Sequence, residues 1–387
     1  MGTQTVLLTL GRLPKGLDIA RSFHAAGWRV LVAEPFGWHL CGLSRSVARS
    51  YRVPAPNTDR EAYLEALLAL IVREHVSLVM PISEETMHVA ALSDRLPDGV
   101  SLFTSTEESV LALHDKLQFA EWLAAEGFAA PQTAALDTDE AQAIASAGLV
   151  VVKDRWGASG SHVTFLDQGE PLPTHEGALV QARLTGKEVS SFSIVHGGKV
   201  SVTVVYQPVI RDGTVSTVFE RIEAPPVEAY VAEIAARSGH TGFLSFDMMV
   251  DGDKVTAFEC NPRANSGIHF LETEDIAPAI FDPGFVPRLN KHRRMQQAYP
   301  TLTLLWGAIG NWPRYRQIGK ALLTSRDVTW RWRDPLPFAL MTPATWPLLR
   351  QAIFEGRSLG EAAINDIGWF GLQRRRSKVI GTSVNFA

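Results

Sequence analysis

The stretch Glu259–Gly267, ECNPRANSG, ends an apolar strand pattern with polar side chains. It directly follows the alternating run KVTAF at residues 254–258, which is typical of a half-buried strand. Glu259, Asn261 and Arg263 occupy alternate positions, so an extended chain points a carboxylate, an amide and a guanidinium to one side. Such groups are costly to bury without a partner. The pattern therefore predicts a charged ligand at the end of this strand.

The preceding run, GFLSFDMMV at residues 242–250, predicts the neighbouring strand. Its even positions are all apolar, and Asp247 lies on the opposite face. A short turn at DGD makes the two runs a hairpin, and a register symmetric about Asp253 places Asp247 directly opposite Glu259. In this register one face carries Val255, Ala257, Glu259 and Asn261. Opposed carboxylates repel each other, so a positive group is expected between them.

A hard divalent cation meets this requirement. Asp247, Glu259 and Asn261 offer the oxygen ligands that Mg²⁺ prefers, and Mn²⁺ is an alternative. Arg263, two residues further on the same side, can hold a phosphate or a developing negative charge. The other interpretation is a hairpin whose acids face solvent without a ligand.

Two lysines upstream suit a phosphate ligand. Lys153 ends the apolar run LVVVK, and residues 157–161 after it are glycine, alanine or serine, which let backbone amides surround phosphate oxygens. Lys116 lies in STEESVLALHDKLQFAEWLAAEG, residues 105–127, whose apolar spacing and final Gly127 predict one helix. The glycine-serine stretch is not a Walker A motif. A turn followed by solvent-facing lysines remains the alternative.

The first hundred residues alternate strand and helix patterns. The runs TVLLTL (5–10), WRVLVAE (28–34), SLVMPIS (77–83) and SLFT (101–104) indicate strands, with helical segments between them. This order predicts a doubly wound α/β lobe over residues 1–104. No GxGxxG motif follows the first strand, so a dinucleotide site is not indicated. Glu84 and Glu85 come where ligands approach such sheets, although acids there also serve as helix dipole partners.

The length and composition describe a multi-lobed protein. At 387 residues the chain exceeds what one core usually supports, so two or three lobes are expected. Cys41 and Cys260 are too few for a disulfide framework and match no metal spacing, and the start of the chain lacks a secretion signal. We expect a cytoplasmic protein without a transmembrane segment and without a nucleic-acid partner.

Charge is distributed unevenly along the chain. Residues 283–387 contain sixteen lysines and arginines against five acids, and six of the ten tryptophans, whereas the whole chain has a net charge of -4. This segment is either a solvated basic surface or a docking face for an acidic substrate, an acidic partner or a membrane surface.

Taken together, these segments resemble the ATP-grasp family. The resemblance covers roughly residues 105–270 and rests on four blocks: HDKLQFAEWLAAEGFAAPQT, VVVKDRWGASGSHV, VQARLTGKEVS and FDMMVDGDKVTAFECNPR. It implies an α/β and α+β multidomain protein. Its parts would be a pre-ATP-grasp lobe at residues 1–104, a two-lobed ATP-grasp domain at residues 105–282 and a helical or mixed extension at residues 283–387. The nucleotide lobe would span about residues 105–185 and the metal-binding lobe about residues 186–282.

The resemblance also implies roles for single residues in binding ATP. Lys116 and Lys153 would bind the α and β phosphates. The loop that covers the triphosphate would consist of Ser159, Gly160 and Ser161. The adenosine would be held by Gln181, Ala182, Leu184 and Glu188. Gln181 stands where the family usually has a glutamate, and its amide oxygen can still accept a hydrogen bond.

Metal, catalytic and substrate roles follow from the same resemblance. The ligands of Mg²⁺ would be Asp247, Glu259 and Asn261. The catalytic residues would be Lys153 and Arg263, with Arg263 stabilising the transferred phosphoryl group or the tetrahedral intermediate. The substrate side would be formed by Glu84, Asn265, Ser266, Gly267 and His269.

The implied activity is ATP-dependent ligation of a carboxylate to an amine. An acyl-phosphate would form from a small metabolite or amino acid, and ADP and phosphate would be released. Two alternatives stay open: an enzyme that forms carboxyphosphate or carbamoyl phosphate, and a nucleotide-binding regulatory protein that docks on an acidic partner or membrane surface through its basic segment. A homodimer is compatible with each. Cys260 points away from Glu259 and is expected in the core.

Overall fold

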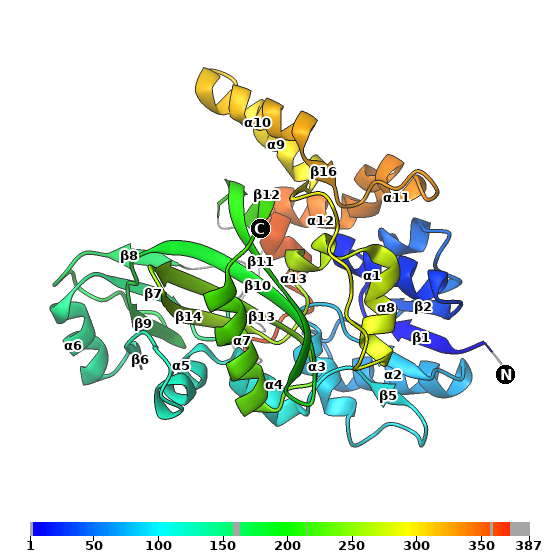
Figure 1. The fold of residues 1–387 in the computed structure, drawn as a ribbon, viewed down its shortest axis with the longest axis horizontal. Helices are drawn as coiled ribbons and strands as arrows, with labels where there is room; N and C mark the ends of the chain where they lie inside the picture. Colours follow the sequence, from blue (N-terminus) through cyan, green and yellow to red (C-terminus); the bar gives the residue numbers. More distant parts are fainter. Residues whose placement is uncertain (1–2, 158–162, 214, 357–358, 372–387) are drawn as a thin grey trace, which may run out of the picture.

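The structure is a computed structural model, and it describes residues 3–157, 163–213, 215–356 and 359–371. These residues form a five-stranded, a four-stranded and a seven-stranded sheet. Figure 1 shows the seven-stranded sheet near the middle of the molecule, with the four-stranded sheet to its left and the five-stranded sheet to its right.

The N-terminal sheet is parallel, with the order β3-β2-β1-β4-β5. Its strands are β1 (Thr5–Leu8), β2 (Arg29–Glu34), β3 (Arg49–Arg52), β4 (Leu78–Met80) and β5 (Ser101–Leu102). Its helices are α1 (Pro14–Ala25), α2 (Arg60–Arg73) and α3 (Thr86–Val89), with the 3₁₀ turns η1 (Cys41–Leu43) and η2 (Ala90–Leu92). Phe23 of α1 packs on one face of the sheet and Leu67 of α2 on the other, which confirms the predicted doubly wound lobe. The sequence did not predict β3, a polar edge strand.

Residues 105–127 form two helices, so the single helix predicted there is wrong. The helices α4 (Glu107–His114) and α5 (Lys116–Ala125) are separated by Asp115, whose backbone is extended. The Asp115 carboxylate accepts hydrogen bonds from two backbone amides in the first turn of α5. Aspartate favours such an N-cap over a helix interior. As a result, Lys116 becomes the first residue of α5.

The small sheet is antiparallel, with the order β6-β9-β7-β8. Its strands are β6 (Thr133–Ala135), β7 (Val150–Asp154), β8 (Thr164–Leu166) and β9 (Ala178–Ala182). The helix α6 (Asp139–Ala147), which Thr138 caps, packs Ile144 against this sheet. Lys153 lies near the end of β7, where the sequence predicted a buried strand.

The large sheet has the order β14-β13-β10-β11-β12-β15-β16. Its strands are β10 (Lys187–His196), β11 (Lys199–Asp212), β12 (Val215–Ile222), β13 (Gly242–Asp251), β14 (Lys254–Asn261), β15 (Arg294–Gln296) and β16 (Arg326–Asp327). The helix α7 (Pro225–Ser238) covers one face and packs Val231 and Ile234 against Leu244 and Phe246. This packing leaves the other face of β13 and β14 available for a ligand.

The predicted pairing of Asp247 with Glu259 is confirmed, but the predicted turn is wrong. Asp251 pairs with Lys254, so the turn consists of two residues rather than being symmetric about Asp253. A bulge at Phe258 then shifts the register by one residue and brings Asp247 opposite Glu259.

The same bulge separates side chains that the sequence predicted on one face. Val255 and Ala257 pack in the core beneath α7, together with Cys260. Glu259 and Asn261 line a cavity on the opposite face. The extra residue at the bulge reverses the alternation of the strand, which simple counting along the sequence misses.

The C-terminal segment packs against the large sheet and against the N-terminal lobe. After the 3₁₀ turn η3 (Ser266–Phe270) and α8 (Thr273–Phe281), it adds β15 and β16 to the large sheet and forms α9 (Ala298–Gly307), α10 (Trp312–Thr324), α11 (Leu336–Ala339), α12 (Met341–Glu355) and α13 (Leu359–Ile364). Leu348 and Ile364 join the core around α1. Arg12 pairs with Glu34 and with Asp366, which ties this segment to the N-terminal sheet. Among the described helices, none combines the length and apolar character needed to span a membrane.

We expect Phe246→Ala to destabilise the hairpin that carries Asp247. Phe246 is fully buried beneath α7, and its ring stacks on Phe119 at 5.9 Å between centroids. Truncation of such a side chain to alanine lowers the free energy of unfolding by about 3–5 kcal/mol. Amide hydrogen exchange of residues 242–261, measured by mass spectrometry, should be faster in the variant because the hairpin opens more often. Val72→Ala, on the exposed face of α2, is the matched control. Unchanged exchange in the Phe246 variant would contradict the packing described here.

Candidate functional site

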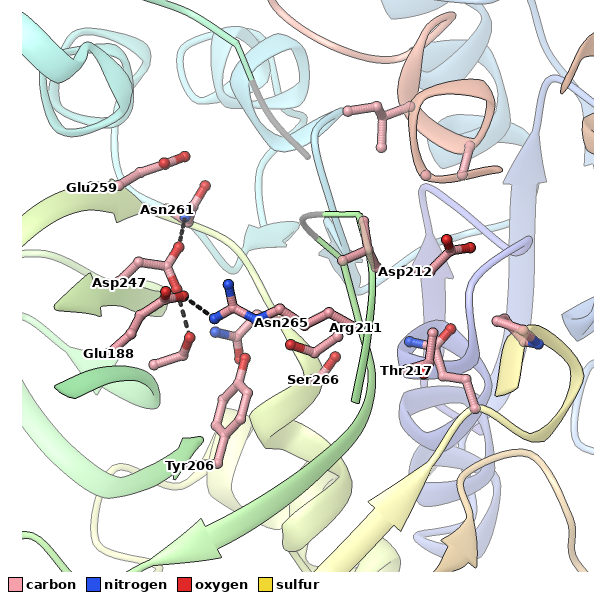
Figure 2. Close-up of a pocket in the computed structure, with 18 of the residues that line it drawn as sticks. Glu188, Tyr206, Arg211, Asp212, Thr217, Asp247, Glu259, Asn261, Asn265 and Ser266 are labelled. Carbon is pink, nitrogen blue, oxygen red and sulfur yellow. Dashed lines mark hydrogen bonds and ion pairs between the residues drawn. The ribbon is translucent and has the colours of Figure 1, made fainter. Parts of the chain in front are cut away.

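A cavity of about 1080 Å³ lies where the three sheets and the C-terminal helices meet. Figure 2 shows part of its polar wall, with Asp247, Glu259 and Asn261 on one side. The cavity is lined by thirteen of the residues predicted for the site: Glu84, Lys153, Gln181, Ala182, Leu184, Glu188, Asp247, Glu259, Asn261, Arg263, Asn265, Ser266 and His269. Ser159, Gly160 and Ser161 lie outside the described residues.

The paired carboxylates lie in different electrostatic surroundings. Asp247 accepts a hydrogen bond from Ser190 Oγ at 2.6 Å and one from Asn261 Nδ2 at 3.3 Å. Burial raises the pKa of Asp247 to about 6, and the charge of Glu259 adds to this increase. Burial also acts to raise the pKa of Glu259, but the charges of Lys116 and Lys153 outweigh it and hold that pKa below its ordinary value. Glu259 therefore carries the stronger negative charge of the pair.

Two lysines approach this pair from separate elements. Lys116 Nζ lies 3.4 Å from Glu259 Oε1 and donates a hydrogen bond to the Gly157 carbonyl at 2.5 Å. Lys153 Nζ donates to the Phe258 carbonyl at 3.2 Å. Burial lowers the pKa of Lys153 to about 8, although the charge of Glu259 acts to raise it. Lys116 is not one of the cavity-lining residues in the described chain, but its ammonium reaches the cavity wall through Glu259.

One end of the cavity runs along β9 and the start of β10. Gln181 is buried, and its Nε2 donates to Thr133 Oγ1 at 3.0 Å. The amide of Ala182 donates to the Gln132 carbonyl at 2.8 Å. Glu188 pairs with Arg211 on β11 at 2.5 Å, so its carboxylate already has a cationic partner. Figure 2 shows Glu188 on the same wall as Asp247.

At the other end of the cavity, Arg263 connects Asn261 on β14 to Glu84 of the N-terminal lobe. Arg263 donates to Asn261 Oδ1 at 3.1 Å and forms an ion pair with Glu84 at 2.5 Å. The neighbouring Glu85 has a structural role, because it accepts hydrogen bonds from Thr9 and from the amides of Ile82 and Ser83. Of the two predicted acids, Glu84 is therefore the one that reaches the cavity.

The predicted substrate residues after β14 serve several purposes. Asn265 donates to the Ser191 carbonyl at 2.8 Å and accepts from the Gly267 amide at 2.9 Å, which fixes the start of η3. Gly267 does not line the cavity in the described chain, and a Cβ there would lie 2.4 Å from Phe192 Cβ. Gly267 is therefore better explained by close packing than by substrate contact. His269 lines the cavity and is oriented by Asp18 at 2.7 Å.

Sequence reasoning missed two cationic residues, one in the loop between β1 and α1 and one in the first turn of α1. Arg12 and Lys15 line the cavity, and Lys15 Nζ donates to the Ala264 carbonyl at 2.5 Å. Burial lowers the pKa of Lys15 to about 7, and the charge of Arg263 lowers it further. The run GRLPKG could have indicated these two residues, because the chain after β1 meets the same edge of the sheet as Glu84.

The donor set suits a metal that keeps phosphate or water ligands. Among the described residues, no group of three or more histidine, cysteine, aspartate or glutamate side chains could hold a metal ion by itself. Two carboxylates, from Asp247 and Glu259, are what Mg²⁺ commonly takes from a protein when a phosphate supplies the remaining oxygens. The Asn261 amide oxygen accepts from Arg263, so it must turn before it can bind a cation.

Residues 113–267 match the family described as the ATP-grasp domain. This segment is an ATP-grasp domain. It contains the paired carboxylates of Asp247 and Glu259 and both lysines described above, Lys116 and Lys153. The resemblance inferred from the four sequence blocks is therefore confirmed, and so is the predicted fold class. No curated protein sequence matches the chain.

Several solved structures share this fold at low sequence identity. Pyruvate carboxylase from Rhizobium etli is 14% identical with a TM-score of 0.55, over 68% of this chain and 27% of that chain. The biotin carboxylase domain of 2-oxoglutarate carboxylase from Hydrogenobacter thermophilus, in complex with MgADP, ADP and bicarbonate, is 16% identical with a TM-score of 0.57, over 71% of this chain and 66% of that chain. An L-amino acid ligase from Bacillus licheniformis is 14% identical with a TM-score of 0.54, over 74% and 78%. The chain thus spans less than two thirds of the length of the first two.

We expect Lys15→Met to stabilise the protein, most strongly at or below neutral pH. The folded-state pKa of Lys15 is about 7 against an ordinary value of 10.5, so the unfolded chain binds more protons between these values. The buried ammonium group of Lys15 therefore lowers the free energy of unfolding by its full amount below about pH 7. This destabilisation becomes smaller as the pH rises toward 10.5.

Urea unfolding at two pH values measures this difference. The Lys15 variant should gain about 2 kcal/mol near pH 6.5 and clearly less near pH 9.5. Lys199→Met, at an exposed position on β11, should show no such pH dependence. Equal stability changes at both pH values would show that burial does not perturb Lys15.

Proposed function

We propose that this chain is an ATP-dependent ligase that joins a small carboxylic acid to an amine through an acyl-phosphate. The observation that carries the proposal is the pair of opposed carboxylates, Asp247 and Glu259, with the ammonium group of Lys116 3.4 Å from one of them, inside an ATP-grasp domain. Such a site suits phosphoryl transfer, in which the protein mainly positions and neutralises phosphate groups.

The nucleotide occupies the part of the cavity between the small and the large sheet. Lys116 and Lys153 bind the α and β phosphates, where buried ammonium groups attract them strongly. Gln181, Ala182 and Leu184 contact the adenine from β9 and the segment after it. Glu188 accepts hydrogen bonds from the ribose hydroxyls, and its ion pair with Arg211 orients the carboxylate for this purpose. Ser159, Gly160 and Ser161, which lie outside the described residues, would contact the phosphates according to the family resemblance.

Asp247 and Glu259 would hold the metal, and Asn261 would join them once its amide turns away from Arg263. Bound Mg²⁺ neutralises the phosphate oxygens during transfer. Asp247 must be ionised to serve as a ligand, and Ser190 favours that form by donating to Oδ1 at 2.6 Å. Lys116 neutralises Glu259 while the metal is absent.

The acid and the amine bind between Arg263 and the N-terminal loop. A carboxylate oxygen of the acid attacks the γ-phosphorus, the bond to the bridging oxygen breaks and ADP leaves. Arg263 stabilises the charge on the transferred group. The amine nitrogen then attacks the acyl carbon, the bond from carbon to the phosphate oxygen breaks, and the nitrogen loses a proton to the phosphate, which leaves as hydrogen phosphate. Lys15 and Glu84 lie beside Arg263 and orient the two substrates.

A second candidate is an enzyme that forms carboxyphosphate from bicarbonate. It is favoured by the fold shared with the biotin carboxylase domain whose structure contains bicarbonate and MgADP. The chemistry at phosphorus is the same, and only the acid differs. Bicarbonate would be smaller than the space available, because the cavity of about 1080 Å³ extends past Arg263 to the C-terminal helices.

Product analysis over a panel of acids and amines tests the proposal. ADP and phosphate should form only when an amino acid or small carboxylic acid is present with an amine, and Glu259→Gln should lower the rate at least a hundredfold. ADP formation with bicarbonate alone would favour the second candidate. Formation of AMP and pyrophosphate would contradict transfer of the γ-phosphoryl group.

Lys153→Met should weaken binding of Mg·ADP by roughly tenfold or more, because it removes a charged hydrogen bond to phosphate from a buried site. Calorimetric titration with Mg·ADP measures the change. Lys187→Met, at an exposed position on β10 near the cavity, should leave affinity within twofold. An unchanged Kd in the Lys153 variant would remove this lysine from the nucleotide site.

A further inference from the structure

The helical hairpin of α9 and α10, residues 298–324, projects from the body of the molecule. Figure 1 shows it as an arm that extends away from the three sheets. Its inner side is covered, because Ile318 and Ala321 of α10 pack with Ile210 and Val218 of the large sheet. The outer side has no covering element within the described chain.

This outer side is unusually apolar for an exposed surface. Trp306 is 71% exposed, Trp312 65% and Leu323 89%, and Ile309 at the bend between the helices is 68% exposed. An arm that exposes several large apolar side chains outside its packed side normally contacts a partner or a membrane. Clustered exposed tryptophan and leucine of this kind mark an interaction site.

The charge of the arm has one sign. Residues 298–325 contain no aspartate or glutamate, and their three charged side chains are Arg314, Arg316 and Lys320. Trp312, Arg316, Lys320 and Leu323 follow one another at intervals of four, four and three residues along α10, so they form one stripe. Two cations therefore lie between two apolar groups on the same exposed face.

This composition fits the boundary of an anionic membrane. Tryptophan and leucine enter the level between headgroups and acyl chains, while long cationic side chains reach back to lipid phosphates. The absence of any acid in the arm, together with its exposed tryptophan and leucine, matches the negative charge and the apolar interior of such a surface. We propose that the α9–α10 arm docks on an anionic lipid surface.

The arm is connected to the cavity. Ala298, Tyr299 and Pro300, the first turn of α9, line the cavity wall, whereas Trp306 and Trp312 lie near the bend of the hairpin. Docking through the outer stripe therefore leaves the cavity residues uncovered. The proposal is independent of the ligase activity, because none of the stripe residues lines the cavity.

Co-sedimentation of the full chain with lipid vesicles tests the proposal. Vesicles of equimolar phosphatidylserine and phosphatidylcholine should bind the protein, and vesicles of phosphatidylcholine alone should bind it far less. Added salt should weaken binding to the anionic vesicles, because it screens the cationic side chains. Absence of binding to the anionic vesicles, or equal binding to both kinds, would overturn the proposal.

Two variants separate the apolar and charged contributions. Leu323→Ser should weaken vesicle binding about tenfold, because a leucine side chain is no longer buried in the lipid. The double variant Arg316→Gln with Lys320→Gln should weaken vesicle binding about fivefold for each cation removed. All three positions are exposed, so the fold should be retained. The matched controls are Val72→Ser on α2 and the pair Lys199→Gln with Lys254→Gln at exposed strand ends, which should bind as the parent does.

Other occupants of the arm give different results. If the outer stripe contacts a second copy of this chain, sedimentation velocity will show a dimer that Leu323→Ser dissociates, and vesicles will not bind. If it contacts an acidic protein, the chain will be monomeric and will not bind vesicles. Either result would overturn the lipid proposal. If the Lys199 and Lys254 control lost as much vesicle binding as the Arg316 and Lys320 variant, the binding would depend on net charge alone. This result would also overturn the lipid proposal.

Discussion

The structure depends on how the repulsion between Asp247 and Glu259 is balanced. The bulge in β14 brings the two carboxylates opposite each other on a buried face, where like charges oppose folding. Lys116 and Lys153 come from α5 and β7, and each lies close enough to hold the pKa of Glu259 down. Elements that are distant in the sequence must therefore assemble around the hairpin before the acids can be buried.

Local patterns were enough to predict the hairpin and the doubly wound lobe, whereas the site position of the two lysines followed only from the family resemblance. They failed where a single residue interrupts a repeat. Asp115 divides one apolar periodicity into two helices by capping the second. Phe258 adds one residue to a strand and reverses its faces. Neither change alters composition, so counting along the chain passes over both.

Long-range partners could not be predicted in the same way. Arg211 meets Glu188 only because β11 lies beside β10 in the sheet, and Lys15 meets Ala264 only because α1 packs beside η3. For Gly267, the sequence predicted a ligand contact that the structure does not favour. The glycine is explained by close packing, because a Cβ at this position would clash with Phe192. A residue type indicates what a side chain can do, and the packing decides which of its roles is used.

The two ends of the cavity draw on different parts of the chain. The carboxylates, the lysines and the β9 edge all fall within residues 113–267, the segment that matches the ATP-grasp domain. Lys15 comes from the N-terminal lobe and Ile364 from the C-terminal segment, and both line the opposite end. The ion pairs of Arg12 with Glu34 and Asp366 hold these two segments together. Substitutions around Ile364 can therefore reshape one end of the cavity without touching the hairpin that carries Asp247 and Glu259.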